Sequence, residues 1–371
     1  MTDGRMTRRD FLQTSASAAA AGGLAMGIGA LGPKAAQAAG ESDVTKTRSY
    51  NPGMEYRRLG KTGLWISAVC MGGHWKRIDK ALPPGSGGNA IFGANLENAD
   101  FQKNRYDLVT RCMEVGINGI DACTCDEVKA YAKAIQGRRD KMYLGCSWYE
   151  RELRNGECRT EKALLKTLEW GMKEAGLEYV DLWRITMHEG SGQHTEAEVQ
   201  EMMKALETAK KQGKVRFTGF SSHDRKHIKW MIETFPTVVD AVVTPYTAGS
   251  KVLPQDSLFD AVKKGNVGVY GIKPFGGNSL FKGDSSPTSP EAEADDRRAR
   301  LAIRYILENP AITAPIPGMI NAHQVDNVAL AVKERRQELS AGEKAELKAA
   351  GQEMWARLPE DYQWLREWEY V

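Results

Sequence analysis

Two cysteines, an aspartate and two histidines are the residues whose chemistry stands out in this sequence. The segment 118–126, NGIDACTCD, brings Asp121, Cys123 and Cys125 close together along the chain. Thiolate and imidazole groups suit zinc and copper, so the cysteines could bind a metal with His74 or His188. The Cys-x-Cys spacing differs from that of structural zinc sites, and the sequence has no second paired motif. We therefore expect no metal site and keep a metal- or thiol-dependent enzyme as the weaker alternative.

His188 is the histidine best placed for catalysis. It follows the segment 179–186, YVDLWRIT, which predicts a buried strand. Side chains two residues apart on a strand share a face, so we expect His188 to point the same way as Thr186, roughly 6–7 Å further on. His74 ends another predicted strand and is expected to reach the same region.

The elements that must position these residues alternate along the chain from residue 54. The predicted strands are 66–73, 118–122, 142–148, 179–186, 215–222, 240–246, 267–275 and 312–318. Helical periodicity lies between them, as in the stripe formed by Val199, Met202, Met203 and Leu206. This alternation predicts a closed (β/α)₈ TIM barrel. An open doubly wound sheet would usually carry G-x-G-x-x-G after its first strand, and CMGGHW lacks it.

Two segments lie outside the repeat. Residues 74–104 form a long loop after strand 1, rich in Gly and Pro, on the face where barrel active sites form. The tail 340–371 begins as a helix, with Ser340 as N-cap and Glu343 completing a capping box. It ends in an aromatic run, which we expect to pack on the barrel wall, with a dimer contact or a cover over the mouth as alternatives. The aromatic residues are Tyr362, Trp364, Trp368 and Tyr370.

The N-terminal segment 1–38 is typical of a twin-arginine signal peptide, with Arg8-Arg9, a weakly apolar Ala/Gly stretch and a small-residue site ending at Ala38. We expect the export machinery to recognise residues 7–12 and the cleaved protein to be periplasmic or otherwise exported. The apolar stretch is too short and glycine-rich for stable membrane insertion. Residues 39–53 are then a linker, and 54–371 the barrel with its tail.

The net charge of the chain limits the classes of partner that it can bind, and its cysteine content limits the classes of fold. Loss of four basic and two acidic residues with the signal lowers the formal net charge from +3 to +1. A nearly neutral protein has no electrostatic basis for binding nucleic acid, so we expect a small-molecule substrate. Six cysteines in a chain of 371 residues do not form a disulfide-dense scaffold.

Five segments in order give the chain a family resemblance. MEYRRLGKTGLWISAVCMGG, GINGIDA, YVDLWRI, GKVRFTGFSSH and IPGMINAHQVDN together resemble the aldo/keto reductase family from residue 54 to about 335. The resemblance implies a barrel preceded by a β-hairpin, a nicotinamide cofactor across its mouth, and hydride transfer to or from a carbonyl carbon. It also implies a catalytic aspartate, tyrosine, lysine and histidine.

Only the aspartate carries over directly, as Asp121. The tyrosine is expected about five residues later, where the chain has 124–126, Thr-Cys-Asp. Ser147 stands at the position of the lysine, and Thr186 at that of the histidine. We therefore take Asp121 and His188 as catalytic candidates, with His188 as the displaced proton donor or carbonyl contact.

The resemblance also implies a cofactor site, and here more positions match. By resemblance, Ser221 and Ser222 bind the nicotinamide carboxamide and Tyr246 stacks on the nicotinamide ring. The segments after strands 7 and 8 would hold the phosphates. No Lys or Arg lies between Met319 and Asn327 to bind a 2′-phosphate, so the cofactor is NADP or NAD, with NAD made more credible. The cofactor candidates are Ser221, Ser222, Tyr246, Lys273, Pro274, Phe275, Gly276, Gly318, Met319, Asn321 and Asn327.

Together these features favour an exported nicotinamide-dependent oxidoreductase acting on a carbonyl or alcohol. The alternative from another class is a non-catalytic or ligand-binding barrel that has lost the reductase activity.

Overall fold

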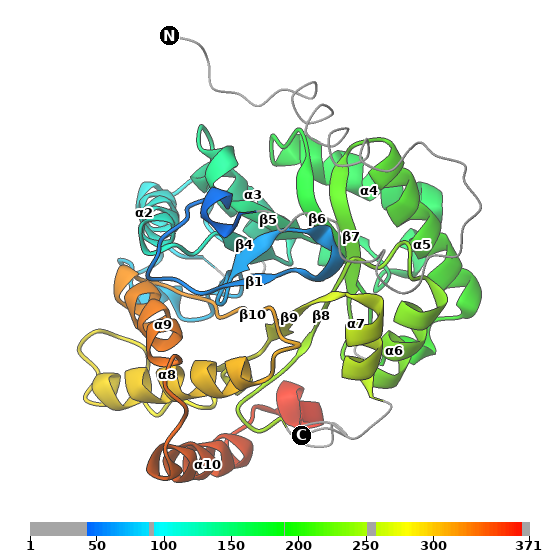
Figure 1. The fold of residues 1–371 in the computed structure, drawn as a ribbon. Helices are drawn as coiled ribbons and strands as arrows, with labels where there is room; N and C mark the ends of the chain where they lie inside the picture. Colours follow the sequence, from blue (N-terminus) through cyan, green and yellow to red (C-terminus); the bar gives the residue numbers. More distant parts are fainter. Residues whose placement is uncertain (1–42, 89–92, 189, 251–256, 366–371) are drawn as a thin grey trace.

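The computed structural model describes residues 43–88, 93–188, 190–250 and 257–365. Its centre is a parallel sheet in the order β10-β9-β8-β7-β6-β5-β4-β3. The strands are β3 (Met71–Gly72), β4 (Gly119–Ala122), β5 (Tyr143–Cys146), β6 (Val180–Thr186), β7 (Val215–Ser221), β8 (Ala241–Pro245), β9 (Gly268–Ile272) and β10 (Ala314–Pro315). A bridge from Gly318 to Gly72 joins the two edges. The structure thus confirms the predicted (β/α)₈ barrel (Figure 1).

An antiparallel hairpin precedes the barrel, as predicted, and it divides the expected first strand. Its strands are β1 (Tyr56–Arg58) and β2 (Trp65–Ser67), with Tyr56 opposite Ser67. The range 66–73 was predicted as one strand, but its beginning pairs with β1 and its end, β3, pairs with β4. The chain changes partners between Ser67 and Met71, which a run of apolar residues cannot reveal.

Helices surround the strands (Figure 1). They are α2 (Ala99–Val115), α3 (Cys125–Ala134), α4 (Glu161–Glu174), α5 (Glu196–Lys211), α6 (Arg225–Thr234), α7 (Leu258–Gly265), α8 (Ala292–Glu308) and α9 (Ala322–Glu334). The predicted stripe of α5 is buried. Apolar packing between strands and helices forms the larger part of the core, and a second cluster, which includes Cys70 and Leu182, fills the barrel interior.

The long loop after the first strand is shorter than predicted. Helix α2 begins at Ala99, inside the expected loop 74–104, because the Asn98 side chain caps it by accepting hydrogen bonds from Asp100 N and Phe101 N. The loop also contains a short 3₁₀ turn, η3 (Ile78–Lys80). Residues 89–92 lie outside the described part of the chain.

The two ends of the described chain both contact the barrel. The expected signal peptide, 1–38, lies outside the described residues, whereas part of the expected linker is held by Arg48, which bonds Met142 O and Asp181. At the other end, α10 (Ala341–Ala356) begins with the predicted Ser340–Glu343 capping box and leads into η9 (Glu360–Leu365). No helix in the described residues has both the length and the apolarity to cross a membrane.

Candidate active site

A cavity of about 380 Å³ opens where the strands end, the face on which barrel enzymes place their active sites. Side chains from separate strands and their following loops converge there because parallel strands all end on one face. Among the residues that line it are His74, Asp121, Cys123, Glu127, Tyr149, Arg154, Arg184, Thr186, Ser221, His223, Lys273 and Trp364.

The floor of this cavity is an ion pair between β4 and β6. Arg184 donates from Nε to Asp121 Oδ1 at 2.8 Å and from Nη2 to Oδ2 at 2.5 Å, and both residues are buried. Burial raises the pKa of the Asp121 carboxyl, and the guanidinium opposes that rise. Burial alone would lower the pKa of Arg184, but the facing carboxylate raises it well above its usual range. The two-bond geometry fixes the cation in position.

The remaining N–H groups of Arg184 extend this pair into a polar cluster. Nη1 donates to Thr186 Oγ1 at 3.0 Å and lies 3.7 Å from Cys123 Sγ. Thr186 and Ser147 are joined by a hydrogen bond of 2.7 Å between their hydroxyl groups. The residues at the expected lysine and histidine positions, Ser147 and Thr186, therefore contact one another, and Thr186 also accepts from the guanidinium.

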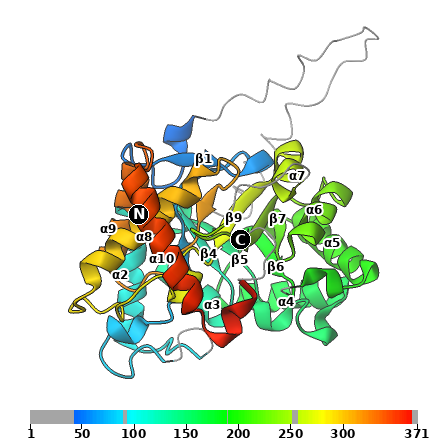
Figure 2. The same cartoon turned by 90° about the horizontal axis from the view of Figure 1, so that it is seen from below.

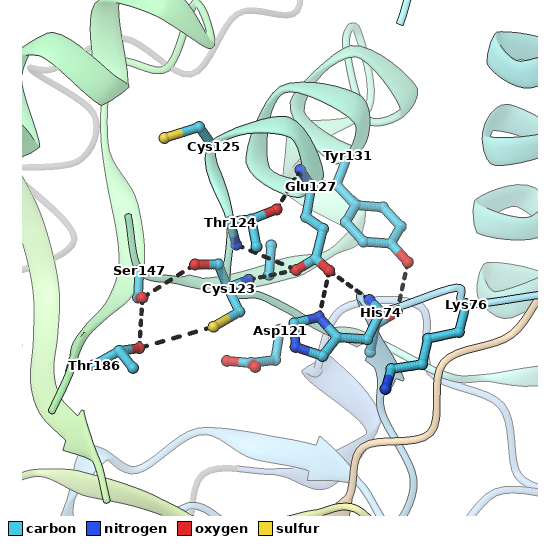
Figure 3. Close-up of polar contacts among 12 residues, drawn as sticks. His74, Lys76, Asp121, Cys123, Thr124, Cys125, Glu127, Tyr131, Ser147 and Thr186 are labelled. Atoms are coloured by element: carbon cyan, nitrogen blue, oxygen red, sulfur yellow. Dashed lines mark hydrogen bonds and ion pairs between the residues drawn. The ribbon is translucent and has the colours of Figure 1, made fainter. Parts of the chain in front are cut away.

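A second buried carboxylate, Glu127 in the first turn of α3, lies beside this cluster. It accepts hydrogen bonds from Cys123 N at 2.7 Å and from Thr124 N at 3.3 Å. Its other oxygen lies 2.5 Å from both the backbone N and the ring Nδ1 of His74 (Figure 3). Burial alone would raise the pKa of Glu127, but His74 and these N–H groups hold it below its ordinary value.

The backbone of His74 is shaped for this contact. His74 has a φ of 52°, in the left-handed region that residues with a side chain seldom adopt. The preceding Gly73 leaves room for the carboxylate, since a Cβ there would collide with the Glu127 carboxyl group. The structure thus brings His74 to the mouth, as expected, and joins it to Glu127.

Sequence reasoning missed Arg184 and Glu127, although a signal for each was present. Arg184 lies two residues before Thr186, so the period of a strand puts both side chains on one face. Glu127 follows Thr124 by three positions, which is the spacing of a capping box, and the structure forms that box at the start of α3. Tyr149, in the short 3₁₀ turn η5 (Tyr149–Arg151), and Arg154 were also missed because both lie beyond the end of β5.

The structure does not place His188 on the strand face, beside Thr186, that the strand period predicted. β6 ends at Thr186, so the strand period does not extend to His188, and His188 is not among the residues that line the cavity. Its ring stacks on His194 with centroids 5.1 Å apart, and its Nε2 lies 3.3 Å from Arg159 Nη2. Of the two catalytic candidates, the structure therefore brings only Asp121 into the cavity.

The two cysteines of the Cys-x-Cys motif face different partners. Cys123 contacts Thr186 and Arg184, whereas Cys125 Sγ lies 3.3 Å from Glu150 and points away from the cavity (Figure 3). Burial raises the pKa of both thiols. Among the described residues, no group of three His, Cys, Asp or Glu side chains is arranged to hold a metal ion.

A second cavity, of about 800 Å³, adjoins the first and shares His74, Lys76, Phe275 and Gly318 with it. Both volumes lie in the range of small-molecule sites, roughly 300–1,000 Å³. Of the cofactor candidates, Ser221, Lys273, Pro274, Phe275 and Gly318 line the first cavity, and Phe275, Gly318, Met319, Asn321 and Asn327 line the second. Because they share lining residues, the two cavities together form one trough, whose lining runs from β7 to α9.

Three cofactor candidates lie outside this lining. Ser222 bonds Ser191 at 2.6 Å, and Gly276 is buried under Met354 of α10. Tyr246 was expected to stack on a nicotinamide ring, but it is buried among α6 and α7, with Phe259 edge-on and its OH bonded to Asn309. β8 ends at Pro245, so Tyr246 turns outward rather than into the barrel mouth.

Basic residues reach the second cavity from elements outside 319–327, the segment that contains no Lys or Arg. Arg77 follows β3, and Arg300 comes from α8, where it donates to Asn327 at 2.6 Å. The N-terminus of α9, capped by Asn321, lies at the same wall and favours a phosphate group. Glu293, Asp295 and Asp296 line the same cavity, but the lack of a basic residue in 319–327 does not leave a phosphate there without cations.

The aromatic tail partly covers the mouth. Trp364 stacks on His223 with ring centroids 4.3 Å apart, and Tyr362 lies beneath Lys76, whose Nζ is 3.1 Å from its OH. The red C-terminal segment runs from α10 to the open end of the barrel (Figure 2). This corrects the expectation of packing on the barrel wall for Tyr362 and Trp364. Trp368 and Tyr370 lie outside the described residues.

Comparison with known proteins points to one family. The model of the aldo/keto reductase family matches residues 85–299, which is more than half of the chain. L-galactose dehydrogenase of Arabidopsis thaliana is 26% identical over 306 residues, covering 76% of this chain and 89% of the plant protein. An uncharacterized oxidoreductase of Bacillus subtilis, YrpG, is 24% identical over 332 residues, covering 76% and 91%.

Solved structures share the fold at lower identity. The holo form of aldo-keto reductase AKR11C1 from Bacillus halodurans superposes with a TM-score of 0.58 at 19% identity, covering 80% of this chain and 96% of that protein. An aldo/keto reductase from Brucella melitensis gives a TM-score of 0.54 at 16% identity, covering 80% and 99%.

Proposed function

Since the chain belongs to the aldo/keto reductase family, we propose that it transfers a hydride between a nicotinamide dinucleotide and a small carbonyl or alcohol substrate. The observation that carries this proposal is the continuous trough at the barrel mouth. One end of the trough holds the Asp121–Arg184 pair, and the other holds the phosphate-compatible wall of α9. The family relationship supports an oxidoreductase of this type; the substrate and the altered site are our inference.

In this proposal the catalytic tetrad is incomplete. Asp121 is retained, Ser147 and Thr186 replace two members, and Arg184 becomes the cation that the aspartate holds. A guanidinium stays protonated at any accessible pH, so Arg184 does not pass a proton. It instead stabilises the negative charge that grows on the substrate oxygen as hydride reaches the carbonyl carbon.

The bound dinucleotide supplies the hydride, and this chain's residues bind and orient it. Ser221 at the end of β7 and Lys273 after β9 line the catalytic end, and Arg77, Arg300 and the α9 N-terminus line the other. We propose NADP or NAD as the cofactor. The two differ by a 2′-phosphate, and we propose that Arg300, which lines the second cavity, recognises it.

The first experiment is calorimetric titration of the protein lacking residues 1–38 with NADPH and with NADH. We expect micromolar binding of at least one nucleotide. Arg300→Met should weaken NADPH binding by about 10- to 100-fold and NADH binding much less, because a charge-assisted hydrogen bond contributes about 1.5–3 kcal/mol. Arg297→Met, on the same helix but paired with Glu346 at the surface, is the matched control and should change neither.

Two results would contradict the proposal or part of it. If the folded protein binds neither nucleotide, the oxidoreductase reading fails and a ligand-binding barrel without reductase activity becomes the better account. If Arg300→Met weakens the binding of both nucleotides equally, Arg300 does not recognise the 2′-phosphate.

We further propose that the protein is exported by the twin-arginine route through residues 7–12 and works in the periplasm or outside the cell. The sequence of the segment 1–38 supports this location.

A further inference from the structure

Carbonyl reduction needs a proton donor as well as a hydride, and the expected tyrosine is absent from positions 124–126. The donor must face the cavity and must be held by a partner that fixes its orientation. We infer that His74 is the catalytic proton donor of this site and that Glu127 is its positioning residue. This inference rests on the proposed function.

The Glu127 carboxylate is well placed to orient a histidine. Two backbone N–H groups from the β4–α3 connection hold one of its oxygens, at 2.7 and 3.3 Å. The other oxygen lies 2.5 Å from His74 Nδ1 and accepts from the backbone N of the same residue. A carboxylate fixed in this way keeps the proton on Nδ1 and turns Nε2 toward the open side. The same arrangement of an acid and an imidazole orients histidine in other enzymes.

The His74 ring lies where it can meet both substrate and water. It sits beside Asp121 at the cavity wall (Figure 3), and 41% of its side chain is exposed. His74 and Asp121 both line this cavity. Exposure lets His74 regain its proton from solvent after each turnover.

Other groups in the cavity are less suited to the task. Burial raises the pKa of the Cys123 thiol, and Arg184 cannot release its proton. Burial lowers the pKa of His223 well below its ordinary value, and Trp364 covers its ring. Tyr149 also lines the cavity, but its hydroxyl accepts a hydrogen bond from Arg154 at 3.1 Å, whereas the His74 ring faces a buried carboxylate.

The proposed step balances. The carbonyl carbon receives a hydride from the reduced nicotinamide, and the electron pair of the C=O π bond moves to oxygen. That oxygen takes the Nε2 proton of the His74 imidazolium, and Arg184 stabilises the charge until transfer is complete. The products are the alcohol, the oxidised nicotinamide and neutral His74. In the alcohol-oxidising direction, neutral His74 accepts the hydroxyl proton.

Steady-state kinetics of His74→Gln and Glu127→Gln test this inference, with 4-nitrobenzaldehyde and 9,10-phenanthrenequinone as carbonyl probes and the nucleotide that binds. We expect His74→Gln to lower kcat by about 10²- to 10⁴-fold, the usual contribution of a general acid. Nucleotide Kd should change less than about threefold, since His74 acts on the proton and not on the cofactor. Glu127→Gln should lower kcat less and shift the pH profile of kcat, whereas Glu127→Asp should restore part of the rate.

Two further histidine variants complete the experiment. His227→Gln, on α6 and bonded to Ser191 away from the cavity, is the matched control and should keep full activity. His188→Gln tests the candidate that strand parity suggested. Retained kcat in folded His74→Gln overturns the inference and leaves the proposed function intact, as does a loss confined to His188→Gln. If the wild type binds nucleotide but reduces neither probe, the proposed reaction fails and this inference fails with it.

Discussion

At the scale of single residues, the site depends on two buried carboxylates with different partners. Asp121 faces a guanidinium through two hydrogen bonds, whereas Glu127 faces an imidazole and backbone N–H groups. The first pair keeps a permanent positive charge at the cavity floor, because arginine does not titrate. The second pair holds an imidazole, a group that can give up and take up a proton. Charge stabilisation and proton transfer are thus assigned to separate side chains.

Removing Arg184 should destabilise the protein. Arg184→Met leaves the Asp121 carboxylate buried without its partner, and breaking one side of such a pair costs about 3–5 kcal/mol. Urea unfolding at neutral pH measures the loss. The double variant Asp121→Leu/Arg184→Met removes the buried charge and should recover much of the stability, though not the activity. Equal stability of Arg184→Met and wild type would show that the pair is not buried as described.

At the scale of elements, the barrel places its chemistry at one end of the strands and its structural ion pairs at the other. Asp181 near the start of β6 accepts from Leu144 N of β5 at 2.9 Å. Its carboxylate also contacts the guanidinium groups of Arg48 at 3.2 Å, Arg139 at 2.6 Å and Arg216 at 2.7 Å. One buried carboxylate therefore joins β5, β6 and β7 to the segment that precedes the hairpin.

This cluster predicts a pH dependence of stability. Burial alone would raise the pKa of Asp181, but the three arginines hold it below its ordinary value of 3.8. A carboxyl group with a lowered pKa stabilises the fold above its unfolded-state pKa, and that contribution is lost as pH falls through its folded-state value. Asp181→Asn should therefore lower the urea midpoint most at pH 6–7, and the difference from wild type should shrink below about pH 4.

The surface ion pair of Arg297 and Glu346 provides the comparison for that experiment. Glu346→Gln should change the midpoint little at any pH, because exposed pairs contribute about 0–1 kcal/mol. A pH-independent loss in Asp181→Asn would mean that packing, and not the charge of Asp181, connects these strands.

At the scale of the whole molecule, the mouth of the barrel is built from segments far apart in the chain. The loop after β3 supplies His74 and Lys76, the segment after β9 supplies Lys273, and the tail supplies Tyr362 and Trp364. A cavity made this way exists only in the folded chain. Such an assembly is compatible with export of an already folded protein, which the N-terminal segment predicts.

Export can be tested on the complete chain. The wild-type protein should appear outside the cytoplasm with an N-terminus at or near residue 39, read by mass spectrometry. Arg8→Lys/Arg9→Lys should keep the full-length protein inside the cell, because the paired arginines are the recognised feature of the signal. Lys34→Arg, a conservative change beyond that feature, should be exported normally. Export of the double variant at the wild-type level would exclude the twin-arginine route.

The sequence by itself determined the architecture. Strand and helix periods and capping residues such as Ser340 are local properties, and they predicted the barrel and the C-terminal helix. The family resemblance predicted the hairpin. The family resemblance also predicted Asp121 as an active-site residue, and the structure places it in the cavity at the barrel mouth.

Only the tertiary structure decided which groups share the active site. Arg184, Glu127 and His74 come from β6, α3 and the loop after β3, and their pairing depends on distances across the barrel that no spacing in the chain encodes. His188 was misplaced because it lies just beyond the end of β6, where the period of two no longer fixes direction. Tyr246 was expected in the mouth from the family resemblance, but it follows the end of β8 and is buried beside Phe259. The tail lies over the mouth, where Trp364 stacks on the His223 ring. A contact between segments so far apart in the chain depends on the closed barrel.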